Sequence, residues 1–346
     1  MIDFTEIDGD QARQLINVEQ VYSVRAASER RRHYSGSMTW KRVSGRFYLY
    51  RKADRDWKSL GPQSSETEKI FDRFRAGRDE AKAHIADLDS RIRAIAPVNR
   101  AMRLGRMPAI SAKLLRRLDR EGLLGTSLSV VGTHALFAYE RMAGVHLASR
   151  HIGTQDIDLL YDSRRELVLV SPEAREQGLI GILRKIDDSF VPTAPGSFRA
   201  ANASGFLVDL IQPLLKGHGP PARSAIAPQI GDLQAAEIAG LIWLENSPAI
   251  ETVVIDERGF PLHVPVPDPR AFALHKLWIY QRDDRDPIKR RRDRAQAEVI
   301  AALLAQYLPH LRFDDPALAA LPNALRVLAP QLNSPQASST SEPGNW

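Results

Sequence analysis

The chain has 346 residues, 43% hydrophobic and 26% charged, a balance typical of a globular protein with a sizeable core. It contains no cysteine, which excludes disulfide bonds and thiolate metal sites and fits a reducing cytoplasm. The acidic start MIDFTEIDGD lacks the apolar segment of a signal peptide, and no apolar run approaches the ~18 residues of a membrane span. We therefore expect a cytoplasmic protein with no membrane partner. The net charge of +6 leans toward a polyanionic partner.

The N-terminal region carries a predicted β-hairpin in which aromatic and basic side chains alternate. Residues 38–43 and 46–51 are β-prone runs that flank the turn residues Ser44 and Gly45. In such a pattern the aromatic rings would stack on the nucleobases of a nucleic-acid strand, and the basic side chains would neutralise its phosphates. A commoner arrangement, with the rings packed on helices and the bases solvated, stays open beside it. The rings are Trp40, Phe47, Tyr48, Tyr50 and Trp57, and the bases are Lys41, Arg42, Arg46, Arg51 and Lys52.

A helix is predicted after this hairpin. Ser65 and Glu68 have the spacing of a capping box, and apolar residues recur at helical intervals as far as Ile92. Gly77 predicts an interruption of the helix and Pro97 predicts its end. The stretch 99–117 has several basic residues and no acid, which fits a phosphate-binding surface and a solvated helix face equally well.

Alternating strands and helices then predict a small mixed α/β unit. An apolar strand at 127–131 leads through Gly132 and Thr133 into an amphipathic helix, and the run HIGTQDIDLLYD supplies the next strand. Further predictions are a strand in ELVLV (166–170), a helix at 178–190, and a hairpin with its turn at 202–205 and its second strand at 206–211.

The C-terminal third is predicted to be mostly helical. We expect a helix at about 233–245, a hairpin with its turn at 257–259, and two helices joined at Asp286-Pro287. The low-complexity end is predicted to be disordered. The expected division is an N-terminal hairpin and helical region, a core, a helical C-terminal domain and a tail, at residues 1–115, 116–215, 216–330 and 331–346.

Two carboxylates stand out in the central strand. Asp156 and Asp158 are two residues apart, so on a strand they project from the same face. Like charges this close repel, and burial raises the cost. A divalent cation such as Mg²⁺ offsets that repulsion directly. The alternative, in which both acids are solvated or salt-bridged at a strand end, is left open by the pair alone.

Two neighbouring features favour the cation. The Gly132-Thr133 turn at the start of a helix presents N–H groups and a hydroxyl to a phosphate. Asp209 lies between apolar strand residues, where an acid needs a partner. A third carboxylate would complete a two-metal site for in-line attack on an α-phosphorus. In that scheme Asp156 and Asp158 hold both ions, while Asp209 is general base and ligand of the second metal.

These motifs resemble the nucleotidyltransferase superfamily related to DNA polymerase β. Its signature is a strand, a glycine turn opening a helix, an acid-x-acid pair and a third acid on a later strand. The segments VVGTHALFAYE, TQDIDLLYD and PDPRAFALHKLWI are similar to a bacterial branch of that superfamily. The resemblance implies an α+β fold, with a polymerase β-like mixed-sheet core and helical N- and C-terminal regions. Thr133 replaces the usual serine, and the longer interval before Asp156, containing AGVHLASRHIG, is expected to form a loop near the site.

The resemblance also assigns further residues and a chemistry. A lysine on a following helix contacts the triphosphate in related enzymes, and Lys276 stands at that place; a lysine snorkelling at a helix edge is the alternative. His134, His151 and His275 are expected to be structural. We expect transfer of a nucleoside monophosphate from an NTP such as ATP to an acceptor hydroxyl, with Mg²⁺ or Mn²⁺ as cofactor and release of pyrophosphate.

The partner of that reaction is less closely defined by the sequence. The acceptor is an RNA or DNA end, a protein side chain or a small molecule, and the basic stretches favour a nucleic acid. A function of a different class stays open: a non-catalytic or regulatory module of a toxin–antitoxin or defence system that binds nucleic acid or a partner protein.

Overall fold

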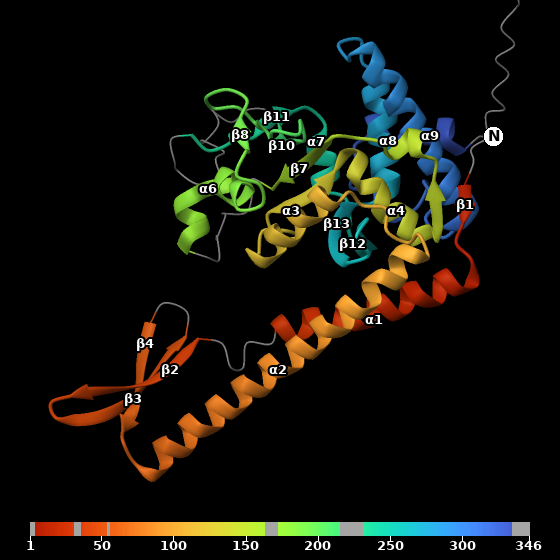
Figure 1. The fold of residues 1–346 in the computed structure, drawn as a ribbon. Coiled ribbons are helices and arrows are strands. Elements are labelled where there is room, and N and C mark those ends of the chain that lie inside the picture. Colours follow the sequence, from red (N-terminus) through yellow and green to blue (C-terminus); the bar gives the residue numbers. More distant parts are fainter. Residues whose placement is uncertain (1–3, 31–35, 54–55, 163–171, 215–230, 334–346) are drawn as a thin grey trace, which may run out of the picture. The chain divides into compact units, whose positions relative to one another are not determined.

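The structure, a computed structural model, describes residues 4–30, 36–53, 56–162, 172–214 and 231–333 (Figure 1). The chain forms two compact units. Unit 1 comprises residues 1–12, 105–257 and 262–346, and unit 2 comprises residues 13–104 and 258–261. The finer division expected at residues 115, 215 and 330 stays a prediction. The predicted strand ELVLV and the tail after residue 333 lie outside the described residues.

Unit 1 is organised around a mixed six-stranded sheet in the order β5-β7-β10-β9-β8, with β11 also paired to β10. β7 and β10 run parallel, while β5 and β9 run antiparallel to the neighbours they flank. This sheet confirms the predicted α+β class and the predicted hairpin with a turn at 202–205. The strands are β5 (Leu128–Val131), β7 (Asp156–Tyr161), β8 (Val191–Pro192), β9 (Arg199–Ala201), β10 (Leu207–Pro213) and β11 (Ala236–Ile238).

The two faces of this sheet cover different hydrophobic clusters. Ile157 and Val208 face the larger cluster, whereas Leu160 and Ile211 face a second cluster that includes Leu274. Because side chains alternate along a strand, Asp158 and Asp209 lie on the same face as Leu160 and Ile211. The acids therefore project on the side of the sheet that α8 covers.

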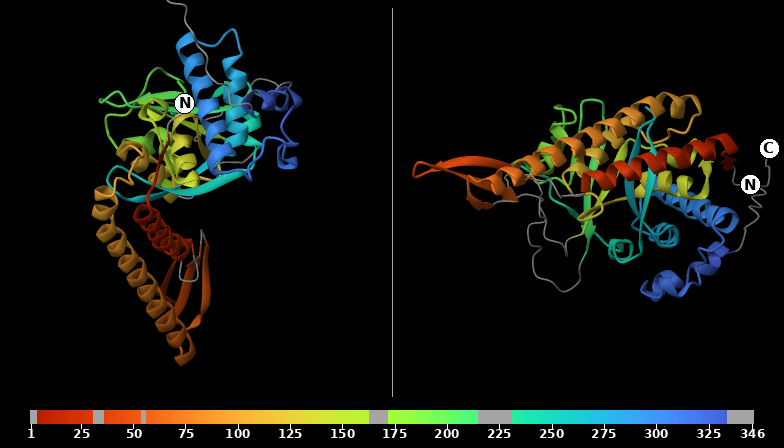
Figure 2. Two further views of the ribbon diagram at one scale, coloured as in Figure 1. Left: turned by 90° about the vertical axis from the view of Figure 1, so that its right-hand side faces the viewer. Right: turned by 90° about the horizontal axis from the view of Figure 1, so that it is seen from below.

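Helices and shorter strands complete unit 1. α8 and α9 pack side by side and confirm the predicted pair of helices joined at Asp286 (Figures 1 and 2). The side chain of Asp286 caps α9 by accepting hydrogen bonds from the amides of Ile288 and Lys289. The longer helices are α3 (Ala109–Arg120), α4 (Ala135–Ala143), α6 (Pro172–Arg184), α8 (Pro269–Tyr280) and α9 (Pro287–Tyr307). The others are α5 (Ser149–Ile152), α7 (Leu241–Glu245), α10 (Asn323–Arg326) and α11 (Ala329–Asn333), and the remaining strands are β1 (Phe4–Glu6), β6 (Val145–Leu147), β12 (Ala249–Ile255) and β13 (Pro261–Pro267).

Two predictions in unit 1 are wrong in detail. The helix predicted at 233–245 is instead β11 followed by the short α7, because Gly240 has a φ of 86° and breaks the helical path. A Cβ at Gly240 would lie 2.8 Å from the ring of Trp278, so the close packing there requires glycine. The expected loop AGVHLASRHIG contains β6, whose Val145 and Leu147 are buried as it pairs with β1, and the short helix α5.

Unit 2 contains most of α1 (Gly9–Arg30), the 37-residue α2 (Ser65–Ala101) and an antiparallel sheet in the order β2-β3-β4. The predicted hairpin is confirmed as β2 (Ser37–Val43) and β3 (Arg46–Ala53). A third strand, β4 (Asp56–Pro62), joins it through β3.

The predicted interruption and end of α2 are wrong, because the helix continues through Gly77 and Pro97. Its capping box is formed by Ser64 and Thr67 rather than by Ser65 and Glu68. The turn around Pro97 is held by Asn99, whose amide donates to the carbonyl of Gly259 at 2.7 Å and accepts from Gln14 at 2.8 Å. These buried contacts offset the backbone hydrogen bond that a proline cannot donate.

None of the helices in the described ranges is both long and apolar enough to cross a membrane.

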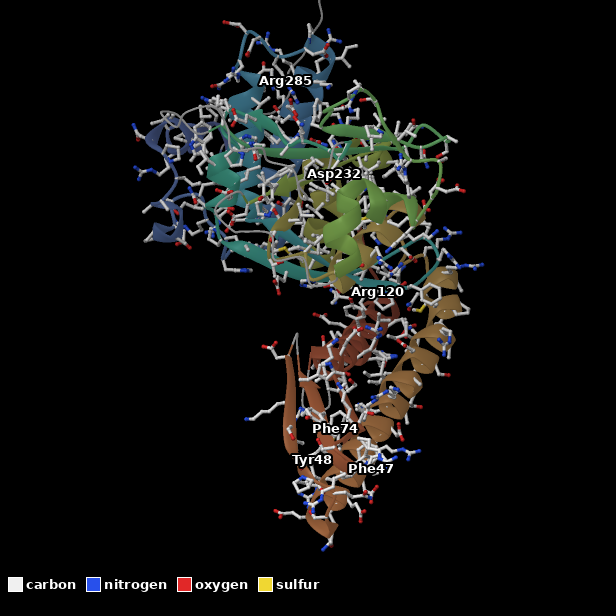
Figure 3. All side chains as sticks on the ribbon, turned by 90° about the vertical axis from the view of Figure 1, so that its left-hand side faces the viewer. Phe47, Tyr48, Phe74, Arg120, Asp232 and Arg285 are labelled. Carbon is white, nitrogen blue, oxygen red and sulfur yellow. The ribbon has the colours of Figure 1, made fainter. Side chains whose placement is uncertain are left out.

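A buried acid offers a test of the packing in unit 1. Gly178 divides α6 at a φ of 63°, and the amides of Leu179 and Ile180 beyond it donate to the carboxylate of Asp232 at 3.1 and 2.9 Å. Asp232 is labelled in Figure 3. Replacing this cap removes two charge-assisted hydrogen bonds, so we expect Asp232→Ala to lower the free energy of unfolding by about 1–2 kcal/mol. Urea denaturation measures the change, with exposed Asp72→Ala as the control; equal stability of both variants would contradict the assigned role.

Candidate active site

Three charged residues form one row across the sheet of unit 1. In the parallel pairing of β7 with β10, Asp158 lies directly opposite Asp209. In the antiparallel pairing of β10 with β9, Asp209 lies directly opposite Arg199. Directly opposed residues on neighbouring strands present their side chains on the same face. The register therefore brings two carboxylates and a guanidinium together from three separate strands.

Asp158 is the most electrostatically strained group in this row. The pKa of its carboxyl is raised to about 6, chiefly by burial and also by the negative charges of Asp156 and Asp209, while the positive charges of Lys276 and Arg199 oppose that rise. Within the described residues its carboxylate has no hydrogen bond or ion pair. It fits closely against Gly132, where a Cβ would lie 2.0 Å from Oδ2. The glycine of the predicted turn is thus what leaves room for this carboxylate.

Asp209 is paired instead of strained. Arg199 binds both of its oxygens, with Nε to Oδ1 at 2.7 Å and Nη2 to Oδ2 at 2.6 Å. The Asp209 side chain is 6% exposed and that of Arg199 is 32% exposed. Such a fork-to-fork contact is among the stronger protein ion pairs, and removing one partner would leave a charge buried alone. Arg199 is thus the resident counterion of the predicted general base.

Asp156 and the Gly132-Thr133 turn make other polar contacts. The Thr154 hydroxyl donates to Oδ1 of Asp156. The hydroxyl of buried Thr133 accepts from Nη2 of Arg292 at 2.5 Å and from Nε2 of Gln296 at 3.2 Å. Arg292 donates also to the carbonyl of Gly153 at 3.2 Å. A half-buried cation on α9 therefore lies at the predicted phosphate-binding turn.

Lys276 is close to the row but has a partner of its own. Its ammonium on α8 lies 2.8 Å from Oδ1 of Asp293, and Arg285 lies 2.8 Å from the other oxygen of that buried acid. Arg285 is labelled in Figure 3. The ammonium still lowers the pKa of Asp158, so its charge acts on the site. The role in triphosphate contact assigned to Lys276 stays a prediction.

The acids provide the hard oxygen ligands that Mg²⁺ prefers, and a pair of carboxylates together with substrate phosphates is a common way of holding it. Asp156 and Asp158 fit this description, because the strained Asp158 carboxylate lacks a partner. Asp209 fits less well while both of its oxygens bind Arg199. Among the residues that the structure describes, no three His, Cys, Asp or Glu side chains are grouped closely enough to hold a metal ion.

The three histidines near the site are buried, in keeping with the structural role expected of them. Burial lowers the pKa of His134 to about 4 and that of His275 to about 3, so both rings are neutral near pH 7. Nε2 of His134 lies 2.7 Å from the hydroxyl of Ser111 in the protein interior. His151 has a lowered pKa because of burial and the nearby charge of Arg150. None of them supplies a charge to the site at neutral pH.

Arg199 and Gln296 are site residues that the sequence reasoning did not single out. Arg199 had a usable signal, because the predicted hairpin turn at 202–205 sets a register that pairs it with Asp209. Arg292 belongs to the basic run KRRRDR, but its neighbours Arg291 and Arg294 are exposed. Only the packing of α9 against α5 and the glycine turn distinguishes Arg292 from them.

Comparison with known families agrees with this geometry. A family model described as Nucleotidyltransferase matches residues 109–322, more than half of the chain. The chain therefore belongs to the nucleotidyltransferase family, and the predicted superfamily is confirmed. No curated protein and no solved structure matches it. The matched residues include all the predicted site residues, as well as Arg199 and Arg292.

The strain at Asp158 predicts a pH-dependent stability. Its folded-state pKa of about 6 is above the ordinary value of 3.8, so the folded state holds the proton more tightly than the unfolded state. This carboxyl therefore costs stability as the pH rises from about 4 to above 6. We expect Asp158→Asn to be more stable than wild type at pH 8 by about 1–3 kcal/mol, and the difference to vanish near pH 4.

Urea unfolding in the presence of a chelator measures both values, with exposed Asp72→Asn as a charge-matched control. A stability difference between wild type and Asp158→Asn that does not change with pH would contradict the assigned strain.

Proposed function

We propose that this protein is a Mg²⁺-dependent nucleotidyltransferase that moves a nucleoside monophosphate from an NTP to an acceptor hydroxyl. The observation that carries the proposal is the cross-strand row in which Asp158 and Asp209 face one another beside the Gly132 turn. Family membership supports the general chemistry. Mg²⁺ dependence, ATP as donor, a nucleic-acid acceptor and a cytoplasmic location belong to this same proposal.

In this proposal Asp156 and Asp158 hold the metal ion, which when bound offsets phosphate charge and aligns the triphosphate. The N–H groups and hydroxyl of the Gly132-Thr133 turn, together with Arg292, bind phosphate oxygens. Asp209 takes the proton from the acceptor hydroxyl. The acceptor oxygen forms a bond to the α-phosphorus while the bond to the bridging oxygen breaks, and pyrophosphate leaves.

Arg199 links nucleotide binding to this chemistry. With no nucleotide present, it holds both oxygens of Asp209, so the general base is blocked. A triphosphate offers the guanidinium a more highly charged partner, two of whose oxygens can accept the same bidentate pair of hydrogen bonds. Transfer of Arg199 from the carboxylate to a phosphate would free Asp209 and add a positive charge to the leaving pyrophosphate at the same time.

A second function, a non-catalytic or regulatory module of a toxin–antitoxin or defence system, is favoured by one observation. Asp209 is already neutralised by Arg199, and a permanently held ion pair would make this face of the sheet a rigid binding surface instead of a catalytic one. In that case nucleic acid or a partner protein binds, but no nucleotide is transferred.

Incorporation of labelled NTPs separates these functions. Wild-type protein with Mg²⁺ and total cellular RNA is expected to transfer label, and Asp158→Asn and Asp209→Asn to lose at least about 10³-fold in rate. Arg292→Ala is expected mainly to raise the KM for the NTP, by about tenfold. The exposed Arg291→Ala on the same helix is the matched control. Absence of transfer by wild type with every NTP, while nucleic acid or a partner protein still binds, would favour the second function.

A further inference from the structure

The sheet of unit 2 has one face packed on α2 and one face that no described element of unit 2 covers. Trp40 of β2 packs against Phe71 of α2, with ring centroids 5.9 Å apart. On the neighbouring strand Leu49 is fully buried and the guanidinium of Arg51 lies 5.5 Å from the centre of the Phe74 ring. Trp40 and Leu49 are directly paired, so these side chains define the helix-facing side.

The strand register assigns the opposite side, which we call the outer face. Lys41 pairs with Tyr48, and Lys52 pairs with Trp57, all at positions that alternate with the helix-facing residues. The Lys41 ammonium lies 3.8 Å from the centre of the Trp57 ring and 5.3 Å from that of Tyr50, so side chains of all three strands meet on this face. The outer face comprises Ser37, Thr39, Lys41, Val43, Arg46, Tyr48, Tyr50, Lys52, Trp57, Ser59 and Pro62.

The charged residues of the outer face are all basic. Its described residues include three aromatic rings and three basic side chains but no acid. The only acid in the described part of the strands is Asp56, which pairs with Ala53 and falls on the helix-facing side. Tyr48 and Tyr50 are half-buried and Trp57 is 40% exposed, so rings are accessible between the charges (Figure 3 labels Tyr48).

We propose that this outer face binds single-stranded nucleic acid. Every nucleobase has a flat face that stacks on an aromatic ring, and each stacked nucleobase contributes about 1–3 kcal/mol. Basic side chains of the protein neutralise the phosphates. Tyr and Trp side chains flanked by Lys and Arg supply both interactions. A protein or lipid partner is a poorer match, because Val43 is the only large aliphatic side chain on this face.

The spacing of the rings favours a single strand over a duplex. Tyr48 and Tyr50 are two residues apart on β3, which places them about 6.6–6.8 Å apart along the strand. Bases stacked within a duplex are about 3.4 Å apart, and their faces are covered by one another. An extended single strand, whose bases are unstacked, has both the spacing and the free faces that the outer face requires.

Lys41 couples the two kinds of contact. Its ammonium now covers the Trp57 ring in a cation–π contact. A nucleobase that stacks on Trp57 displaces the ammonium, which is then free to pair with a phosphate of the same strand. The Lys41 ammonium thus covers the Trp57 ring in the free protein and gains a phosphate partner when the nucleic-acid strand binds. This binding does not depend on the chemistry proposed for unit 1, since none of the residues there is involved.

Fluorescence anisotropy with the full-length protein and labelled oligonucleotides tests the proposal. The probes are a mixed-sequence single-stranded RNA, the DNA of the same sequence and its duplex, each over a range of salt concentrations. Wild type is expected to bind both single strands at least about tenfold more tightly than the duplex. Tyr48→Ala/Tyr50→Ala/Trp57→Ala is expected to weaken binding about tenfold or more while keeping the salt dependence.

Variants that remove charge distinguish binding at the outer face from non-specific electrostatic attraction of the nucleic acid to the protein. Lys41→Gln/Arg46→Gln/Lys52→Gln is expected to reduce the slope of log affinity against log salt by about 2, since each phosphate contact contributes about 0.7 on a single strand. The control is Arg42→Gln/Lys58→Gln, which removes two exposed basic side chains on the helix-facing side and is expected to keep the affinity within about twofold of wild type. Circular dichroism verifies folding; should the aromatic triple variant unfold, Trp57→Leu alone is expected to weaken binding about fivefold.

Absence of single-strand binding by wild type would overturn the proposal. An equal loss in the helix-facing control would do the same, as would an acidic polypeptide that competes as well as the oligonucleotide, which would point to a protein partner.

Discussion

The parallel register of β7 and β10 is the constraint on which the site depends, because it places Asp158 and Asp209 directly beside one another. Two carboxylates on neighbouring strands repel one another, and the structure relieves this repulsion at only one of them. Arg199 on the next strand neutralises Asp209, whereas Asp158 keeps its strain as a pKa of about 6. Under the proposed function, a site with one satisfied and one unsatisfied acid would favour a cation, since the unsatisfied carboxylate gains most from binding it.

Much of this arrangement could be predicted from local sequence patterns. An acid-x-acid pair in an apolar strand fixes which face the acids share, and a glycine before a helix marks the turn beside them. The hairpin turn at 202–205 sets the register that pairs Asp209 with Arg199. These features are set by neighbours a few residues away, so periodicity and turn residues are sufficient to identify them.

The remaining features are decided by contacts between distant segments. α2 continues through Pro97 because Asn99 binds Gly259, 160 residues further along the chain. Arg292 differs from exposed Arg291 only in lying against Thr133, at a separation of 159 residues. The partner of Lys276 is likewise settled by how α8 packs on α9, where Asp293 lies. No local pattern encodes such pairings, and tertiary packing overrode the helix propensities around Gly240 and Pro97.

Binding of Mn²⁺, followed by electron paramagnetic resonance, addresses the charge balance of the three aspartates without depending on an acceptor. If the positive charge of Arg199 opposes a metal ion bound beside it, Arg199→Gln will bind Mn²⁺ several-fold more tightly than wild type when no nucleotide is present, and Asp158→Asn will bind it at least about tenfold more weakly. Addition of a non-hydrolysable NTP should narrow the gap between wild type and Arg199→Gln. Equal Mn²⁺ affinities in all three proteins, with and without the nucleotide, would contradict this charge balance.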